Sequence, residues 1–150
     1  MRVRAAILMF LGATSLCLGT FVRSDPASAA STTYRVIVHP DNPAHSIQRT
    51  FLANAFLKKV TKWPDGETIN PVDRDGNSET RREFAEQVLD RSLSAVRSYW
   101  QQMIFSGRGL PPPELESDDA IVRYVVGHRG AVGYVSGDVK LAGVKALAIE

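Results

Sequence analysis

The residues whose types and spacing could do chemistry lie in one short polar loop of this 150-residue chain, from Arg74 to Thr80. A helix is expected from Glu79, and the first N–H groups of a helix have no intrahelical acceptor and lie at its positive end. Ser78 and Thr80 would add hydroxyl donors. Asn77 would add an amide, and Arg74 a guanidinium that can donate two parallel hydrogen bonds. These residue types predict a site for a small oxyanion, held without a metal ion.

Glu79 lies inside this segment and works against an anion site. A carboxylate about 4 Å from a bound anion would cost roughly 4 kcal/mol at an effective dielectric constant of about 20. The same carboxylate stabilises a helix start by about 0.3–1 kcal/mol, so the helix needs no bound anion. The alternative is an ordinary capped helix in which Arg74 pairs with a neighbouring carboxylate, that of Asp73, Asp75 or Glu79. Both interpretations stay open, because the sequence does not say which way Glu79 points.

No other group of residues has the spacing of a catalytic or metal site. The histidines, at His39, His45 and His128, lack metal-ligand spacing, and the sequence contains no P-loop, dinucleotide fingerprint or nucleophile elbow. Asp118 and Asp119 are typical of the negatively charged start of a helix rather than of a catalytic pair. We therefore expect a protein that is not an enzyme, with no metal and no cofactor.

Residues 1–29 have the pattern of a secretory signal peptide. Two arginines precede a long run of apolar and small residues, and Ala27-Ser28-Ala29 fits the rule for signal cleavage. Cleavage near Ala29 or Ala30 would leave a periplasmic or secreted domain, residues 30–150. The alternative is an uncleaved anchor, since the apolar run is nearly long enough to span a bilayer.

The charge balance gives no sign of a nucleic-acid partner. The chain has 18 basic and 16 acidic residues; three arginines and one aspartate lie in residues 1–29, which leaves 15 of each in the remainder. Balanced, dispersed charge is not the footprint of nucleic-acid binding. The single cysteine, Cys17, also lies in the leader, so the exported domain is expected to have no disulfide and no thiolate site. We expect contact with a membrane only through the signal peptide.

The rest of the chain alternates expected strands and helices. Apolar and β-branched runs predict strands near residues 34–38, 68–72, 131–135 and 144–149. Apolar faces at helical spacing predict helices that start near Ser46, Glu79, Ser92 and Ser117. This alternation is typical of an α/β domain with a mixed, mostly parallel sheet flanked by helices. A mature chain of about 120 residues has the usual size of one domain.

Four segments, in order along the chain, resemble motifs of the periplasmic phosphate-binding proteins of ABC transporters, a branch of the type II solute-binding fold. They are Ala55–Lys59 with Trp63, the loop Arg74–Thr80, Phe105–Gly109 with the prolines that follow it, and the strand Gly130–Val135. The Phe105–Gly109 segment is similar to one found in short, single-lobe relatives of this family. The resemblance covers most of residues 35–149 and implies one periplasmic-binding-protein-like lobe. It implies binding of phosphate or a similar oxyanion by Arg74, Asn77, Ser78 and Thr80. It also implies a link to ABC-type phosphate uptake, with an ABC permease as partner.

The chain departs from this family in three respects. Ser78-Glu79-Thr80 stands where the family has Ser-Gly-Thr, and Asp41-Asn42-Pro43 stands where a Gly/Ser-rich phosphate loop would follow the first strand. The family's proteins also have two lobes with the anion between them, and this chain has the length of one. The alternative function is therefore a protein-interaction module of the cell envelope that kept the fold and lost the ligand, because a lone lobe leaves its former cleft face uncovered.

Overall fold

The computed structural model describes residues 33–76 and 78–150. The expected signal peptide, residues 1–29, and the candidate ligand Asn77 lie outside the described residues. The described part falls within one unit, Ser31–Glu150. Within this part, the helices are too short or too polar to cross a membrane.

A five-stranded sheet forms the centre of this unit. Its strands follow the order β2 (Ser46–Ile47), β7 (Lys145–Ile149), β1 (Tyr34–Val38), β6 (Ala131–Ser136) and β3 (Asn70–Pro71). The central strand β1 pairs antiparallel with β6 over five residue pairs and with β7 over three.

The direction of the strands corrects one part of the predicted fold. The pairs β2–β7 and β3–β6 are parallel, over two residue pairs each, and the longer pairings of β1 are antiparallel. The sheet is mixed, as predicted, but it is not mostly parallel. Alternation of strands and helices indicates parallel pairing only where a helix links two neighbouring strands. Here β1 and β6 are neighbours although most of the chain lies between them.

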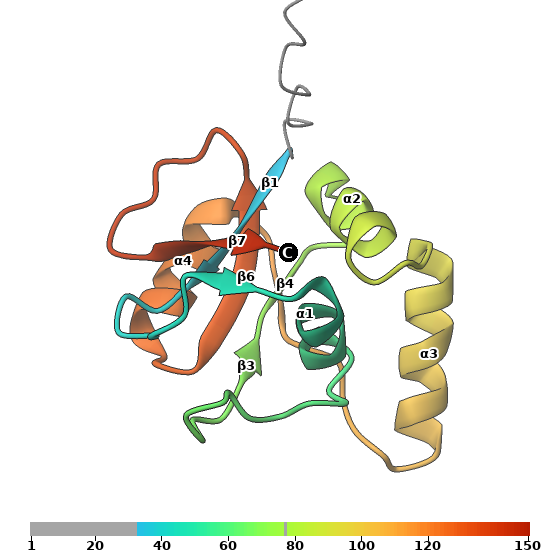
Figure 1. Ribbon diagram of the computed structural model, residues 1–150. Helices are drawn as coiled ribbons and strands as arrows, with labels where there is room; N and C mark the ends of the chain where they lie inside the picture. Colours follow the sequence, from blue (N-terminus) through green and yellow to red (C-terminus); the bar gives the residue numbers. More distant parts are fainter. Residues whose placement is uncertain (1–32, 77) are drawn as a thin grey trace, which may run out of the picture. The chain divides into compact units, whose positions relative to one another are not determined.

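Helices cover both faces of the sheet, as Figure 1 shows. One core cluster contains residues of α1 (Arg49–Phe56), α2 (Glu79–Gln87) and α3 (Leu93–Phe105), and a second contains residues of α4 (Asp118–Gly127). Strand β1 serves both: Tyr34, Val36 and Val38 belong to the first cluster, and Ile37 belongs to the second. Because side chains alternate along a strand, one apolar run fills two helical layers.

Two glycines explain why the segment around β6 packs so closely against its neighbours. A Cβ on Gly130 would lie 1.8 Å from the carbonyl oxygen of Thr68, and a Cβ on Gly133 would lie 2.8 Å from Cγ2 of Ile121. The carbonyl of Gly130 also accepts a hydrogen bond from the Trp63 indole at 3.0 Å. Two of the segments that carry the family resemblance, Trp63 and Gly130–Val135, are therefore in direct contact.

The helix starts were predicted well at two serines and wrongly at a third. The hydroxyls of Ser92 and Ser117 each accept a hydrogen bond from the N–H three residues further on, at 3.2 and 3.1 Å, so both residues are helix caps. Ser46 instead lies in β2, where it pairs with Ala148 of β7. The helix begins later, at Arg49. The backbone of Ser46 pairs with the sheet. A serine next to an apolar run is compatible with a helix cap and with a strand, so the sequence pattern does not reveal this pairing.

Candidate functional site

The segment with the predicted anion ligands leaves the main sheet and enters α2. Asp73 and Arg74 form β4, which pairs in parallel with β5 (Glu114–Leu115) in a separate two-stranded sheet. The loop that follows turns at Ser78, whose N–H donates to the carbonyl of Asp75 at 3.0 Å. Arg74 therefore lies one short loop before the start of α2.

The start of α2 carries no side-chain cap from its cap residue. Ser78 has the extended backbone of such a residue, with φ −71° and ψ 129°, but within the part of the chain that the structure describes its side chain makes no capping hydrogen bond. The first N–H groups of a helix have no acceptor inside the helix. The N–H groups of Glu79 and Thr80 are therefore donors that α2 itself leaves unused.

Thr80 directs its hydroxyl at the end of β6. Its Oγ1 lies 3.1 Å from Oγ of Ser136, and the residue is buried. The N–H of Ser136 donates in turn to Oδ1 of Asp118 at 3.3 Å. Because Asp118 is the first residue of α4, the starts of α2 and α4 both meet the end of β6.

Arg74 completes this group from β4. Its Nη1 lies 3.1 Å from Oδ1 of Asp118, and the two side chains are mostly buried, with 12% and 19% of their surfaces exposed. Within residues 33–76 and 78–150, neither Nη1 nor Nε of Arg74 has a hydrogen-bond partner, although Nη1 is in ionic contact with Asp118. The guanidinium is therefore held by charge while two of its nitrogens keep unused donors.

Sequence reasoning missed Ser136 and the charged member of this group, Asp118. Its place in the first turn of α4, behind the Ser117 cap, was predicted and is confirmed. Its pairing with Arg74 was not predicted, because no local pattern links two residues so far apart in the sequence. Asp118 brings a carboxylate to the position where an anion would meet Arg74.

Glu79 is directed elsewhere. Its side chain is 64% exposed and forms an ion pair with Arg82, one turn further along α2. An exposed and paired carboxylate is screened by water and by its partner, so its repulsion of a nearby anion is much weaker than that of a buried one. The carboxylate that opposes an anion at Arg74 is that of Asp118 rather than that of Glu79.

A buried charged group fixes β4 to α2 and to β6. Asp73 accepts hydrogen bonds from the hydroxyl of Tyr134 and, at 2.9 Å, from the N–H of Arg74. Nη2 of Arg81 lies 3.1 Å from Asp73 and 2.8 Å from Glu114. Its Nη1 donates to the carbonyl of Arg74 at 2.9 Å. These bonds hold the backbone on both sides of the Arg74 side chain, so the guanidinium is presented from a rigid strand.

Burial is the main influence on the pKa values of Asp73 and Tyr134. It raises the pKa of Asp73 above its ordinary value, while Arg81, the Tyr134 hydroxyl and the Arg74 N–H act in the opposite direction. Burial and the neighbouring charge of Asp73 also raise the pKa of Tyr134, which stays a neutral donor. The described residues contain no group of His, Cys, Asp or Glu side chains that could hold a metal ion.

The structure therefore brings together only some of the predicted ligands that it describes. Arg74 and Thr80 belong to one group, which Asp118 and Ser136 link together. Ser78 lies at the start of α2, and Asn77 falls outside the described residues. What this arrangement offers is a set of donors: the guanidinium, a hydroxyl and the first N–H groups of a helix.

The chain belongs to the PBP superfamily, because the family model of a PBP superfamily domain matches residues 33–146. No curated protein matches the chain. Among solved structures, the chain is similar to an ABC-type phosphate transport receptor from Vibrio cholerae, with a TM-score of 0.60 and 22% identity over 78% of this chain and 46% of that one.

Two further solved structures have the same fold. One, from Clostridium perfringens, is described as a phosphate ABC transporter substrate-binding protein with bound phosphate; its TM-score is 0.60 with 22% identity, over 78% of this chain and 44% of that one. The other is PstS from Borrelia burgdorferi, with a TM-score of 0.59 and 12% identity, over 79% of this chain and 47% of that one. The chain thus has the α/β fold of a PBP-like lobe and spans less than half the length of these structures.

Proposed function

We propose that the protein is an exported, non-enzymatic binding module for phosphate or a similar oxyanion, which binds at the start of α2. The observation that carries the proposal is the mostly buried Arg74 guanidinium. Among the described residues two of its nitrogens have no hydrogen-bond partner, and it lies one loop before a helix start that the Ser78 side chain does not cap. Helix starts and arginine forks are the donors that oxyanions use where no metal is involved. The phosphate bound in the similar Clostridium perfringens structure supports this class of ligand.

Each predicted ligand has a separate role in this proposal. Arg74 supplies the charge, and the N–H groups of the first turn of α2 supply oriented dipoles. Thr80 can keep its contact with Ser136 and still donate to the anion, because a hydroxyl both donates and accepts. Ser78 would add a second hydroxyl, and Asn77 an amide.

The Asp118 carboxylate sets both the strength and the selectivity of this site. It partly neutralises Arg74, so we expect weak binding that needs millimolar phosphate. A carboxylate accepts hydrogen bonds and donates none when ionised. It therefore tolerates an oxyanion that carries a proton, such as hydrogen phosphate, and repels sulfate, which carries none at neutral pH.

The site is tested by calorimetric titration of the protein with phosphate, together with the variants Arg74→Gln and Arg82→Gln. Arg82 is the matched control, because it is an exposed arginine of α2 whose partner is Glu79. We expect wild type and Arg82→Gln to bind alike and Arg74→Gln to bind about tenfold more weakly, the usual size of a lost charged hydrogen bond. If millimolar phosphate gave no heat and no thermal shift, the proposal would be contradicted.

The same proposal includes a periplasmic or secreted location and a role in ABC-type phosphate uptake, with an ABC permease as partner. It is supported by the structural neighbours, which are described as proteins of phosphate ABC transport. Copurification from the cell envelope tests it. Recovery of a permease in the presence of phosphate is the expected result, whereas a stoichiometric partner whose binding ignores phosphate would favour the alternative of an interaction module.

A further inference from the structure

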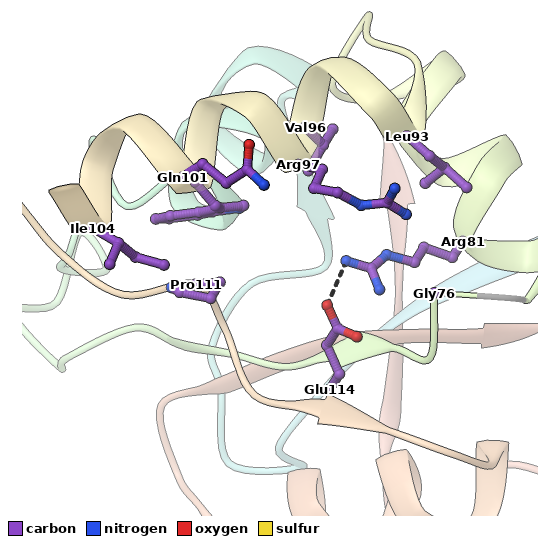
Figure 2. A pocket seen from close by; sticks show the side chains of 10 residues that line it. Gly76, Arg81, Leu93, Val96, Arg97, Gln101, Ile104, Pro111 and Glu114 are labelled. Atoms are coloured by element: carbon purple, nitrogen blue, oxygen red, sulfur yellow. Dashed lines mark hydrogen bonds and ion pairs between the residues drawn. The ribbon is translucent and has the colours of Figure 1, made fainter.

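A separate cavity lies between α3 and the strand β5, on the side of the β4–α2 loop where Gly76 is found. Its volume is about 260 Å³, which suits a ligand smaller than a typical drug molecule. Arg74, Ser78 and Thr80, the proposed phosphate ligands that the structure describes, are not among the residues that line it. Figure 2 shows this cavity with its lining side chains.

One end of the cavity is cationic. Arg97 reaches from α3 toward Arg81, as seen in Figure 2. The guanidinium of Arg81 is already used by Asp73 at 3.1 Å and Glu114 at 2.8 Å, and by the carbonyl of Arg74 at 2.9 Å. Arg97 has no hydrogen bond or ion pair with any of the described residues that flank it. It is therefore the cation of this cavity that remains available for a ligand.

The other end of the cavity is apolar. Ile104 and Pro111 lie at the end opposite to Arg97 (Figure 2), and the buried side chains of Val96 and Trp100 also line the cavity. Ile104 is 46% exposed beside the cavity. A ligand that covered it would gain the free energy of apolar burial while its charged end reached Arg97.

We propose that this cavity is a second binding site, for a small monocarboxylate with a compact apolar body. The carboxylate would pair with Arg97, and the body would lie against Trp100, Ile104 and Pro111. A single available cation matches a single negative charge. The carboxylate of Glu114, at the cationic end, disfavours a ligand with two charges, so this site differs from the proposed phosphate site in both place and ligand class.

The proposal is tested with three probes: phenylacetate, its uncharged amide phenylacetamide, and acetate, which lacks the apolar body. Binding is followed by NMR through the indole signal of Trp100 and the methyl signals of Val96 and Ile104. We expect phenylacetate to shift these signals in a saturable way and to bind at least about tenfold more tightly than either analogue, since each analogue lacks one of the two contacts. Equal binding of phenylacetamide, or shifts confined to other residues, would overturn the proposal.

Variants separate this site from the phosphate site. Arg97→Gln should weaken phenylacetate binding about tenfold, while Arg123→Gln, a matched change of an exposed arginine on α4, should leave it unchanged. Arg97 is itself exposed, so both variants are expected to fold, which circular dichroism checks. Arg74→Gln should leave phenylacetate binding intact, and phosphate should not compete. An unchanged affinity in Arg97→Gln, or competition by phosphate, would overturn the proposal whether or not phosphate binds elsewhere.

Discussion

The starts of α2 and α4 meet the same end of β6, yet they differ in capping. The cap residue of α4 accepts a hydrogen bond from a free N–H group, and that of α2 does not. At α4, the Ser117 hydroxyl accepts a hydrogen bond from the N–H of Ala120, and the Asp118 carboxylate pairs with Arg74. At α2, the side chain of Ser78 makes no capping bond within the described residues, and Glu79 turns outward to Arg82. An acidic residue in the first turn therefore does not by itself occupy the free N–H groups of a helix start. The direction of the side chains decides whether an external anion can bind.

The largest expected effect comes from the variant Asp118→Asn, which removes the carboxylate that pairs with Arg74. The amide keeps an acceptor for the Ser136 N–H but no longer neutralises Arg74 or repels a fully ionised ligand. We expect the preference for phosphate over sulfate to fall by about tenfold or more, because a charged contact of this kind is worth about 1.5–3 kcal/mol. The two affinities are measured by competition at constant ionic strength.

Asp119→Asn is the control for this change, since it removes a neighbouring and exposed carboxylate of the same helix turn. It should leave the ratio of the two affinities nearly as it is. If Asp118→Asn had no more effect on the ratio than Asp119→Asn, Asp118 would not be the group that sets selectivity.

A second comparison removes each cap residue in turn. Ser117→Ala should lower the free energy of unfolding by about 1 kcal/mol, because it deletes a hydrogen bond that closes α4. Ser78→Ala should lower it by less than about 0.5 kcal/mol, since Ser78 makes no such bond. Urea unfolding of both variants measures the difference, and equal losses would show that the two helix starts are not distinct.

The smallest effect is expected from Glu79→Gln. The Glu79 carboxylate is exposed and paired with Arg82, so its removal should change the affinity for phosphate by less than about threefold. Calorimetry of this variant beside Asp118→Asn measures how much each acidic residue weakens phosphate binding. A gain of tenfold or more in Glu79→Gln would mean that Glu79, and not Asp118, limits binding.

Much of the fold was accessible from the sequence because it rests on local signals. The caps at Ser92 and Ser117, and the apolar run of β1, depend on residues a few positions apart. The antiparallel pairing of β1 with β6 was not accessible, since strand direction depends on the path of the chain between them. The same limit applies to the candidate site: the loop from Arg74 to Thr80 was found from its own residues, whereas Asp118 and Ser136 arrive from distant elements.

Glycines give a physical basis to the family resemblance. Gly130 meets the backbone of Thr68 so closely that no side chain fits, and its carbonyl accepts the Trp63 indole. The resemblance in these segments therefore has a basis in packing.

The most direct test of the account is a crystal structure of the protein soaked in phosphate. The account predicts tetrahedral density within hydrogen-bond distance of the Arg74 guanidinium and of the first N–H groups of α2, with Asp118 facing a protonated oxygen. Phosphate at full occupancy elsewhere, or an Arg74–Asp118 contact that excludes the anion from the start of α2, would contradict it.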